Sequence, residues 1–512
     1  MPSITQVVTT CDQTTLITPQ AFQDRVQDGE ALFIFDNKVY KVDGFVARHP
    51  GGELAIRHGI GRDVTDEIRS MHPPTVYNKM MKKFYLGDYH QAPVDTDDKP
   101  RLLKPSSSPA LETTWAGGMS VEEFDKELDH LHQHHAANLA QDRLATTVDN
   151  QTMRRKYQAM EQDLIDRGMF ECNRYRYAKE CCRYVTLIWT SLWLGLRGDH
   201  WTHFLGSAIC MAGFWHQLVF TAHDAGHNEI TGRVQTDHLI GVLIANFIGG
   251  LSLGWWKDNH NVHHIVTNDP EHDPDIQHLP FLAITTRFFN NLYSSYYRRV
   301  MAFDAAAKVF VAHQHHLYYL VMAFGRFNLH VLSFTYLLTS KNVRMPRLEW
   351  VGIAVFFMWY GSLMASLPSW PIRIMYIFVS YMLTFPLHVQ ITLSHFGMST
   401  DIIKDEPFPA HQLRTTMDVD CPVWLDWFHG GLQYQAVHHL FPRLPRHNLR
   451  LCVPVVRQFC NETGLHYYMY NFSTGNGVIL GALKSVADQV RLMNDVAKYN
   501  ADILGDNNKK LA

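Results

Sequence analysis

The stretch QYQAVHH, residues 433–439, places two adjacent histidines three residues after a glutamine and directly before a Leu-Phe-Pro segment. Neutral imidazole is a common protein ligand for iron, zinc and copper. A single histidine pair is nevertheless more often an ordinary surface or core group than part of a metal site. The function of this pair therefore depends on whether other histidines of the chain lie beside it.

The composition averages two kinds of segment. The chain has 512 residues, and its mean hydropathy of -0.17 is that of an ordinary soluble protein. The first ~180 residues are polar and charged, whereas later segments include apolar runs that approach the ~20 residues needed to cross a bilayer. We therefore expect a soluble part followed by a membrane part.

The charge and the N-terminal residues narrow the class of protein. The net charge is -3 and the pI is about 6.9, so we expect no nucleic acid partner. The N-terminus has no basic segment followed by an apolar one, so no cleaved secretory signal is visible and we expect this end in the cytosol. Eight cysteines show no C-x-x-C pair, and we expect them to be reduced.

Residues 14–90 are predicted to form a small α+β domain, because short apolar runs alternate with polar helical stretches. This segment contains the sequence HPGG, beginning at His49, and a second loop histidine at His72. The pattern resembles the cytochrome b5 family. The resemblance implies that His49 and His72 are the two axial ligands of haem b and that the domain carries electrons rather than binding oxygen.

A linker is predicted over residues 91–120, which are rich in proline, serine and charged residues. Amphipathic helix is predicted from there to about Arg183, beginning at a capping box of Ser120 and Glu123. We assign residues 121–470 to a membrane domain with a cytosolic helical cap. Residues 471–512 are assigned to a C-terminal cytosolic tail.

Two helical hairpins are predicted to cross the membrane, because short polar turns join two pairs of apolar runs. Basic residues lie outside the hairpins, which indicates that this side is cytosolic. The run 239–256 is interrupted by Gly249-Gly250 and is predicted to be re-entrant or interfacial. The run 317–339 carries Arg326 and is predicted to be interfacial or buried. The predicted spans are residues 184–196, 203–222, 351–368 and 372–394.

Three histidine clusters follow these apolar runs at their cytosolic ends: HDAGH at 223–227, HNVHH at 260–264, and QYQAVHH. Histidines spaced by three or four residues lie on one face of a helix, so one helix can present two rings to one ion. If the run 239–256 crossed the membrane, the first two clusters would lie on opposite sides. A shared site therefore favours two spanning hairpins.

The clusters HxxxH, HxxHH and QxxHH, in this order, resemble those of the membrane-bound fatty acid desaturases. Together with the N-terminal haem domain they resemble the front-end subgroup. The resemblance implies an all-α integral membrane domain with about four transmembrane helices and a site with two non-haem iron ions that uses O2. The implied catalytic metal ligands are His223, His227, His260, His263, His264, Gln435, His438 and His439. We expect His395, at the cytosolic end of the last helix, to supply one further ligand.

The resemblance also implies partners and a location. Electrons would come from NADH through NADH-cytochrome b5 reductase and then the fused haem domain. The protein would be a multi-pass protein of the endoplasmic reticulum membrane, with the haem domain and the histidine clusters facing the cytosol. Four carboxylates flank the clusters and are candidates to orient the imidazole rings. They are Asp224, Asp258, Asp273 and Asp275.

The substrate is predicted from residues 421–432 (CPVWLDWFHGGL), which look most like fungal sphingolipid delta-8 desaturases, acting on the long-chain base of ceramides. An acyl delta-5 or delta-6 front-end desaturase would share every iron ligand, and a lipid hydroxylase would use the same oxidant. A haem electron carrier and a histidine-rich metal transporter are alternatives from other classes. A transporter needs polar ligands at mid-membrane, and a carrier has no need of the three clusters.

Overall fold

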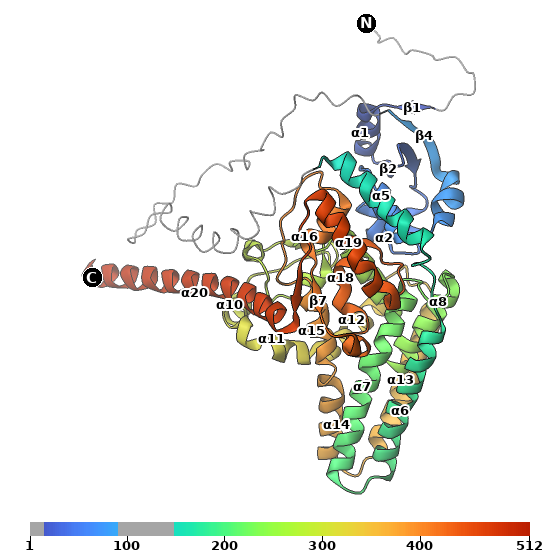
Figure 1. Cartoon of the computed structure of the whole chain (residues 1–512). Helices are drawn as coiled ribbons and strands as arrows, with labels where there is room; N and C mark the ends of the chain where they lie inside the picture. Colours follow the sequence, from blue (N-terminus) through green and yellow to red (C-terminus); the bar gives the residue numbers. More distant parts are fainter. Residues whose placement is uncertain (1–14, 91–147, 512) are drawn as a thin grey trace. The chain divides into compact units, whose positions relative to one another are not determined.

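The computed structural model describes residues 15–90 and 148–511 (Figure 1). The chain divides into two compact units, residues 1–112 and residues 113–512. The predicted linker and the capping box of Ser120 and Glu123 lie outside the described residues.

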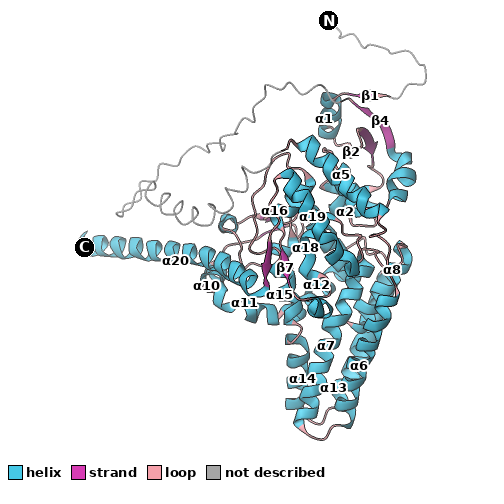
Figure 2. Cartoon of the chain, viewed as in Figure 1, coloured by secondary structure: helices cyan, strands magenta, loops and turns pink. Residues whose placement is uncertain are grey.

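The N-terminal unit is built on a four-stranded sheet in the order β1-β4-β3-β2 (Figure 2). Strands β2 and β3 form an antiparallel hairpin whose two turn residues, Asp36 and Asn37, have left-handed backbones with φ of 48° and 56°. Such a turn matches the natural twist of paired strands. The strands are β1 (Leu16–Ile17), β2 (Leu32–Phe35), β3 (Lys38–Lys41) and β4 (Tyr85–Tyr89).

Successive side chains of β2 point to opposite faces of the sheet, and each face has its own apolar core. Leu32 and Ile34 pack with Phe22 of the first helix. Phe33 and Phe35 pack on the opposite side, where the remaining helices carry the two predicted haem histidines. The helical segments are α1 (Pro19–Gln27), η1 (Val46–Arg48), α2 (Glu53–Arg57), α3 (Thr65–Met71), η2 (Val76–Met80) and η3 (Met81–Phe84).

The second unit contains a bundle in which α6 (Tyr175–Arg197), α7 (Trp201–Gly226), α13 (Pro346–Ser366) and α14 (Trp370–Met382) lie side by side (Figure 1). Three helices among the described residues are long and apolar enough to cross a membrane. They are α7, α13, and α14 continued by α15 (Phe385–Leu393). A bent helix pair is a fourth candidate, whereas α6, predicted as the first span, is not among them.

The bent pair consists of α8 (Val234–Val242) with the π-helical segment η4 (Leu243–Ile248), followed by α9 (Leu253–Ile265). The chain turns by 118° between them. The turn contains Gly250, whose φ is 71° and whose position leaves no room for a side chain beside Phe356. A glycine is required because the backbone is left-handed and closely packed. The predicted interruption at Gly249-Gly250 thus coincides with this bend.

Two buried polar side chains, Arg326 and Glu349, hold the bend. Arg326 of α12 (Gly325–Thr339) donates to the carbonyl of Gly249 at 2.7 Å, where η4 ends. The Glu349 carboxylate of α13 accepts hydrogen bonds from the Ser252 hydroxyl at 2.5 Å and from the Asn246 amide at 3.0 Å. These contacts fix where α9 begins, and α9 carries the second histidine cluster.

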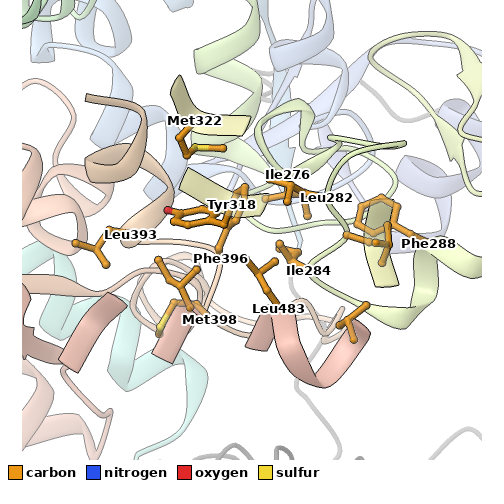
Figure 3. Packing of buried hydrophobic residues seen from close by; sticks show 14 of the residues in the cluster. Ile276, Leu282, Ile284, Phe288, Tyr318, Met322, Leu393, Phe396, Met398 and Leu483 are labelled. Atoms are coloured by element: carbon orange, nitrogen blue, oxygen red, sulfur yellow. The ribbon is translucent and has the colours of Figure 1, made fainter. Parts of the chain in front are cut away.

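A large apolar core joins α11 and α15 to the long C-terminal helix α20 (Phe472–Leu511), as Figure 3 shows around Tyr318, Leu393 and Leu483. Residues up to Val490 belong to this core. The segment after residue 470, assigned above to a separate tail, therefore begins as part of the membrane unit. Its neighbours are α10 (Ala305–Ala312) and α11 (Gln314–Ala323).

A further core supports the third histidine cluster. The Tyr157 hydroxyl of α5 donates to the Leu440 carbonyl at 2.8 Å, and its ring stacks on Phe441 with centroids 5.3 Å apart. Short strands β7 and β8 pair in parallel beside it. The elements are α5 (Asn150–Asp166), α16 (Phe408–Thr415), β7 (Asp418–Asp420), α17 (Asp426–His429), α18 (Gln435–Leu440), α19 (Leu449–Thr463) and β8 (Met469–Asn471).

Candidate functional site

The first histidine cluster lies at the end of α7. His223 is in the last turn and His227 caps the helix one turn later, with ring centroids 4.7 Å apart. Between them, a side chain at Gly226 would collide with the ring of Trp256. The glycine in HDAGH therefore allows α9 to lie directly against α7. The ring centroids of Trp256 and His223 are 5.2 Å apart.

The second cluster is presented by α9. The Ser252 hydroxyl caps this helix by accepting a hydrogen bond from the Trp255 backbone N–H at 3.0 Å. His260 and His264 are one turn apart, and their Nε2 atoms lie 3.1 Å apart. His263 faces a different side, where its ring lies 4.6 Å from that of His395.

The third cluster lies on the short helix α18. It follows Gly430 and Gly431, which both have left-handed backbones. A side chain at Gly430 would collide with the Phe220 ring of α7, so glycine is required there for close approach. The backbone N–H of Ala436 donates to the buried carboxylate of Asp418 at 2.7 Å, which fixes the start of α18.

These three helices, together with the residues that follow α15, bring the predicted histidines into two adjacent groups. Within each group the potential ligand atoms lie within 4.8 Å of one another. The first group is His223, His227, His260 and His438, and the second is His263, His395 and His439. His264 lies between the groups, with its ring 4.8 Å from that of His438 and 4.3 Å from that of His439.

The nitrogens that face inward fit metal ions. Five of the cluster histidines have a buried ring nitrogen with no hydrogen-bond partner among the described residues, an arrangement that is costly unless a ligand occupies the site. Burial, and then the neighbouring imidazoles, lower the pKa of His227, His264 and His439 well below its ordinary value, so these rings are neutral. The nitrogens are Nε2 of His223, His227, His438 and His439, and Nδ1 of His264.

Outer partners fix the orientation of three rings. Asp273 accepts a hydrogen bond from His263 Nδ1 at 2.9 Å. Gln412 accepts one from His439 Nδ1 at 2.9 Å, and its amide donates to the His264 carbonyl at 3.0 Å. His395 Nδ1 lies 3.3 Å from the Thr415 carbonyl. Each contact leaves Nε2 free to face the metal site.

Of the four carboxylates predicted to orient rings, Asp273 accepts a hydrogen bond of normal length from a cluster histidine, His263. The Asp275 carboxylate lies 3.9 Å from the Nδ1 atoms of His260 and His263, and it accepts a hydrogen bond from the Asn259 amide. Asp258 lies close enough to Tyr296 to raise the pKa of that tyrosine, after the larger effect of burial.

Asp224 has a structural role instead. Its nearest carboxylate oxygen lies 3.9 Å from His223 Nδ1, too far for a hydrogen bond. It accepts from the Tyr177 hydroxyl at 2.6 Å and from Arg446 Nε at 2.5 Å. Asp224 therefore ties α7 to α6 and to the segment that follows the third cluster.

Gln435 lies at the edge of the first group. Its side chain is 5% exposed. It lines a cavity of about 10 Å³ together with His223 and His438, which is enough space for one water molecule.

The two histidines of the N-terminal unit also face each other. The ring centroids of His49 and His72 are 6.0 Å apart. Their Nδ1 atoms lie 3.0 Å from the Gly52 carbonyl and 3.1 Å from the Ile68 carbonyl, and these contacts orient the two rings. This arrangement fits two axial ligands of one haem iron.

Comparison with protein families matches residues 199–471 to the fatty acid desaturase family and residues 18–90 to the cytochrome b5-like heme/steroid binding domain. The Delta 8-(E)-sphingolipid desaturase of Emericella nidulans is 41% identical over 530 residues, covering 94% of this chain and 96% of the relative. The enzyme of the same name from Komagataella phaffii is 40% identical, covering 94% and 95%. The Delta(8)-fatty-acid desaturase of Helianthus annuus is 31% identical, covering 98% and 97%.

Proposed function

Because this chain belongs to the fatty acid desaturase family and carries a cytochrome b5-like domain, we propose that it introduces a double bond at the delta-8 position of the sphingoid long-chain base of ceramides. The proposed substrate rests on the similarity, over nearly the whole length of the chain, to relatives named Delta 8-(E)-sphingolipid desaturase. The chain is an oxidoreductase of membrane lipids.

The two histidine groups are the proposed binding sites of two iron ions, with His264 between them and Gln435 at the edge of the first. Bound iron supplies the O2 activation that is needed to remove two hydrogens from unactivated methylenes. The chain contributes imidazoles in fixed orientations. Asp273 and Gln412 hold two of these rings through Nδ1, so that Nε2 remains the metal-binding atom.

His49 and His72 are the proposed axial ligands of haem b. A haem held by both imidazoles would pass electrons and would have no free position for O2. We infer that electrons come from NADH through a separate NADH-cytochrome b5 reductase and pass through this domain to the iron site.

The proposed location is the endoplasmic reticulum membrane, with the haem domain and the three histidine clusters on the cytosolic side. The 118° bend supports this topology, because it returns α9 to the end of α7 without a further crossing. Basic residues that flank the hairpins agree with it. An acceptor site for N-glycosylation introduced beside His264 should remain unmodified, and its glycosylation would contradict the topology.

An acyl front-end desaturase remains the second candidate, because a relative named Delta(8)-fatty-acid desaturase is 31% identical. The histidine clusters do not distinguish these substrates. Product analysis does.

The test is expression of the full chain in yeast that lacks delta-8-unsaturated sphingoid bases, followed by mass spectrometry of its lipids. We expect unsaturated long-chain base with the wild type and none with His438→Ala at matched expression. The purified wild type should contain about two non-haem irons per haem. Newly unsaturated acyl chains without unsaturated base would contradict the substrate. Absence of product from fully iron-loaded and haem-loaded protein would contradict the activity.

A further inference from the structure

A second group of buried polar side chains lies outside the histidine clusters, two turns before His223 on α7. We call it the polar cluster. It comprises His216 and Gln217 of α7, Gln390 of α15 and His429 of α17, which are 5%, 1%, 3% and 4% exposed. Gln390 joins two of these elements, because its amide lies 3.3 Å from His429 Nδ1.

The polar cluster does not satisfy its own hydrogen-bonding groups. The Gln217 amide donates to His216 Nδ1 at 3.1 Å, so the ring proton of His216 is on Nε2. The side-chain oxygen of Gln217 has no partner among the described residues, and neither Nε2 of His216 nor the side-chain oxygen of Gln390 makes a hydrogen bond of normal length. The His216 and Gln390 side chains nevertheless lie close enough to interact. The cluster thus presents one buried donor and two buried acceptors. Leaving such groups unpaired costs free energy, which a polar ligand would recover.

We propose that the polar cluster binds the hydroxyl and amide groups at the polar end of the sphingoid base. This inference rests on the proposed function and specifies how its substrate is recognised. A hydroxyl and an amide N–H of the lipid donate to the oxygens of Gln217 and Gln390. An oxygen of the lipid accepts from Nε2 of His216.

The position of the polar cluster suits a reaction several methylenes from the polar groups. His216 and His223 are seven residues apart, which is two helical turns, or about 10 Å, on the same face of α7. The ring of Phe220 lies between them, 5.2 Å from the His216 ring. Phe220 also lines the small cavity beside His223 and His438. An alkyl chain that passes Phe220 would therefore extend from the polar cluster to the metal site.

The outer side of the polar cluster offers a route for a lipid. The ring of His429 lies 6.3 Å from Phe472, and Phe428, beside it, lies 5.8 Å from Trp427. Trp427 and Phe472 are 48% and 46% exposed. Exposed aromatic side chains of this kind are typical of the surface that meets the lipid headgroups.

This chemistry separates a sphingoid base from an acyl lipid. The region around an ester or thioester carbonyl has an acceptor but no hydroxyl or N–H to donate. An acyl substrate would therefore leave the oxygens of Gln217 and Gln390 unpaired. A site built to bind a substrate hydroxyl discriminates strongly against the analogue that lacks it.

The test compares a ceramide with its analogue lacking the 3-hydroxyl group, in the same vesicles, using full-length protein with reductase and NADH. The variants are Gln217→Met and Gln390→Leu, which keep the side-chain volume and remove the polar atoms. Gln458→Met, on the exposed surface of α19, is the matched control. We expect the wild type and the control to prefer the ceramide by about 10-fold or more in kcat/KM. In the two variants this ratio should approach one, with an unchanged iron-to-haem ratio.

The outcomes are distinct. If the wild type converts the ceramide and both iron-loaded variants keep its preference, the polar cluster is not the recognition site, although the proposed function stands. If the wild type converts the two lipids equally, recognition of the hydroxyl is refuted whatever the variants do. If the wild type converts neither lipid, the proposed function itself fails.

Discussion

At the scale of single residues, the state of each imidazole depends on what its outer nitrogen contacts. The buried carboxylate of Asp273 accepts from His263 Nδ1 and, at 2.7 Å, from the backbone N–H of Asn268. The backbone contact fixes the carboxylate, and the carboxylate fixes the ring.

We predict that Asp273→Asn lowers iron affinity by about 10- to 100-fold, because the neutral amide removes the negative charge beside His263 and replaces one of the two oxygens that face its Nδ1. The iron-to-haem ratio after dialysis against a chelator measures this. Asp304→Asn, at the start of α10, is the control, since asparagine also caps a helix. Iron retention equal to the wild type in Asp273→Asn would show that the carboxylate does not tune the site.

A second prediction concerns Gln435. An amide oxygen is a weaker metal ligand than imidazole, so Gln435→Ala should retain much of the iron but lose about 10- to 100-fold in turnover. Gln435→His should bind iron with partial activity, whereas His438→Ala and His439→Ala should lose iron and product. Product and iron are measured at matched expression. Near wild-type turnover of fully loaded Gln435→Ala would remove Gln435 from the site.

The family could be predicted from the sequence, and the comparisons confirm it. The prediction was possible because the spacing within HxxxH and HxxHH depends only on local helical geometry. The sequence could not reveal Gln412, which contacts both His264 and His439 from a helix without a histidine motif. Only tertiary packing brings such residues together. The same holds for Asp224, whose position inside HDAGH suggested a contact with the rings while its hydrogen bonds go to Tyr177 and Arg446.

At the scale of elements, the bend before α9 depends on Glu349. One oxygen of this fully buried carboxylate accepts from both Ser252 and Asn246. Glu349→Ala should lower the free energy of unfolding by about 1–3 kcal/mol, because these donors would lose their acceptor. It should also lower iron content, whereas Glu349→Gln should preserve both. Thermal unfolding and iron analysis test this. Unchanged values in Glu349→Ala would show that the bend holds without the carboxylate.

A pH dependence follows from the contact between β7 and α18. Burial raises the pKa of Asp418 to about 7, although the Tyr467 hydroxyl and the Ala436 N–H act to lower it. The folded state therefore holds a proton that the unfolded state releases near pH 4. The stability from this group is full below about pH 4 and is lost as the pH rises through about 7.

We therefore predict that the melting temperature of Asp418→Asn falls less than that of the wild type between about pH 4 and pH 7. Scanning calorimetry of the purified proteins at several pH values measures the difference. Parallel curves for the two proteins would indicate that Asp418 titrates normally.

The helical membrane domain and its three to four candidate spans agree with the fold class expected from the apolar runs. The C-terminal helix was harder to predict. The apolar residues of α20 that enter the core, such as Leu483 and Val486, form a short stripe on one face of the helix. Polar residues lie between them in the sequence, so the segment does not resemble a membrane span. Its partners on α10 and α11 are more than 150 residues earlier, beyond any local pattern.

At the scale of the whole molecule, two redox centres are carried by two separately packed units. We predict that His72→Ala loses the low-spin haem spectrum and most turnover, while the iron content of the membrane unit is unchanged. Absorption spectroscopy and iron analysis on the same sample separate the two effects. Activity retained in cells without free cytochrome b5 would show that the fused domain is not required.

The proposed ligands of the two metal sites lie at different points along the chain, so the two sites are completed at different stages of translation. The proposed haem histidines both lie before residue 90, whereas the proposed iron ligands lie on or beside α7, α9, α15 and, last, α18. Domains fold as the ribosome releases them. A chain that ended before His438 would thus accept electrons at its haem and have no iron centre to receive them. If the proposed ligands hold, the third cluster is the last part of the iron site to be translated, and only chains that contain it can bind both irons.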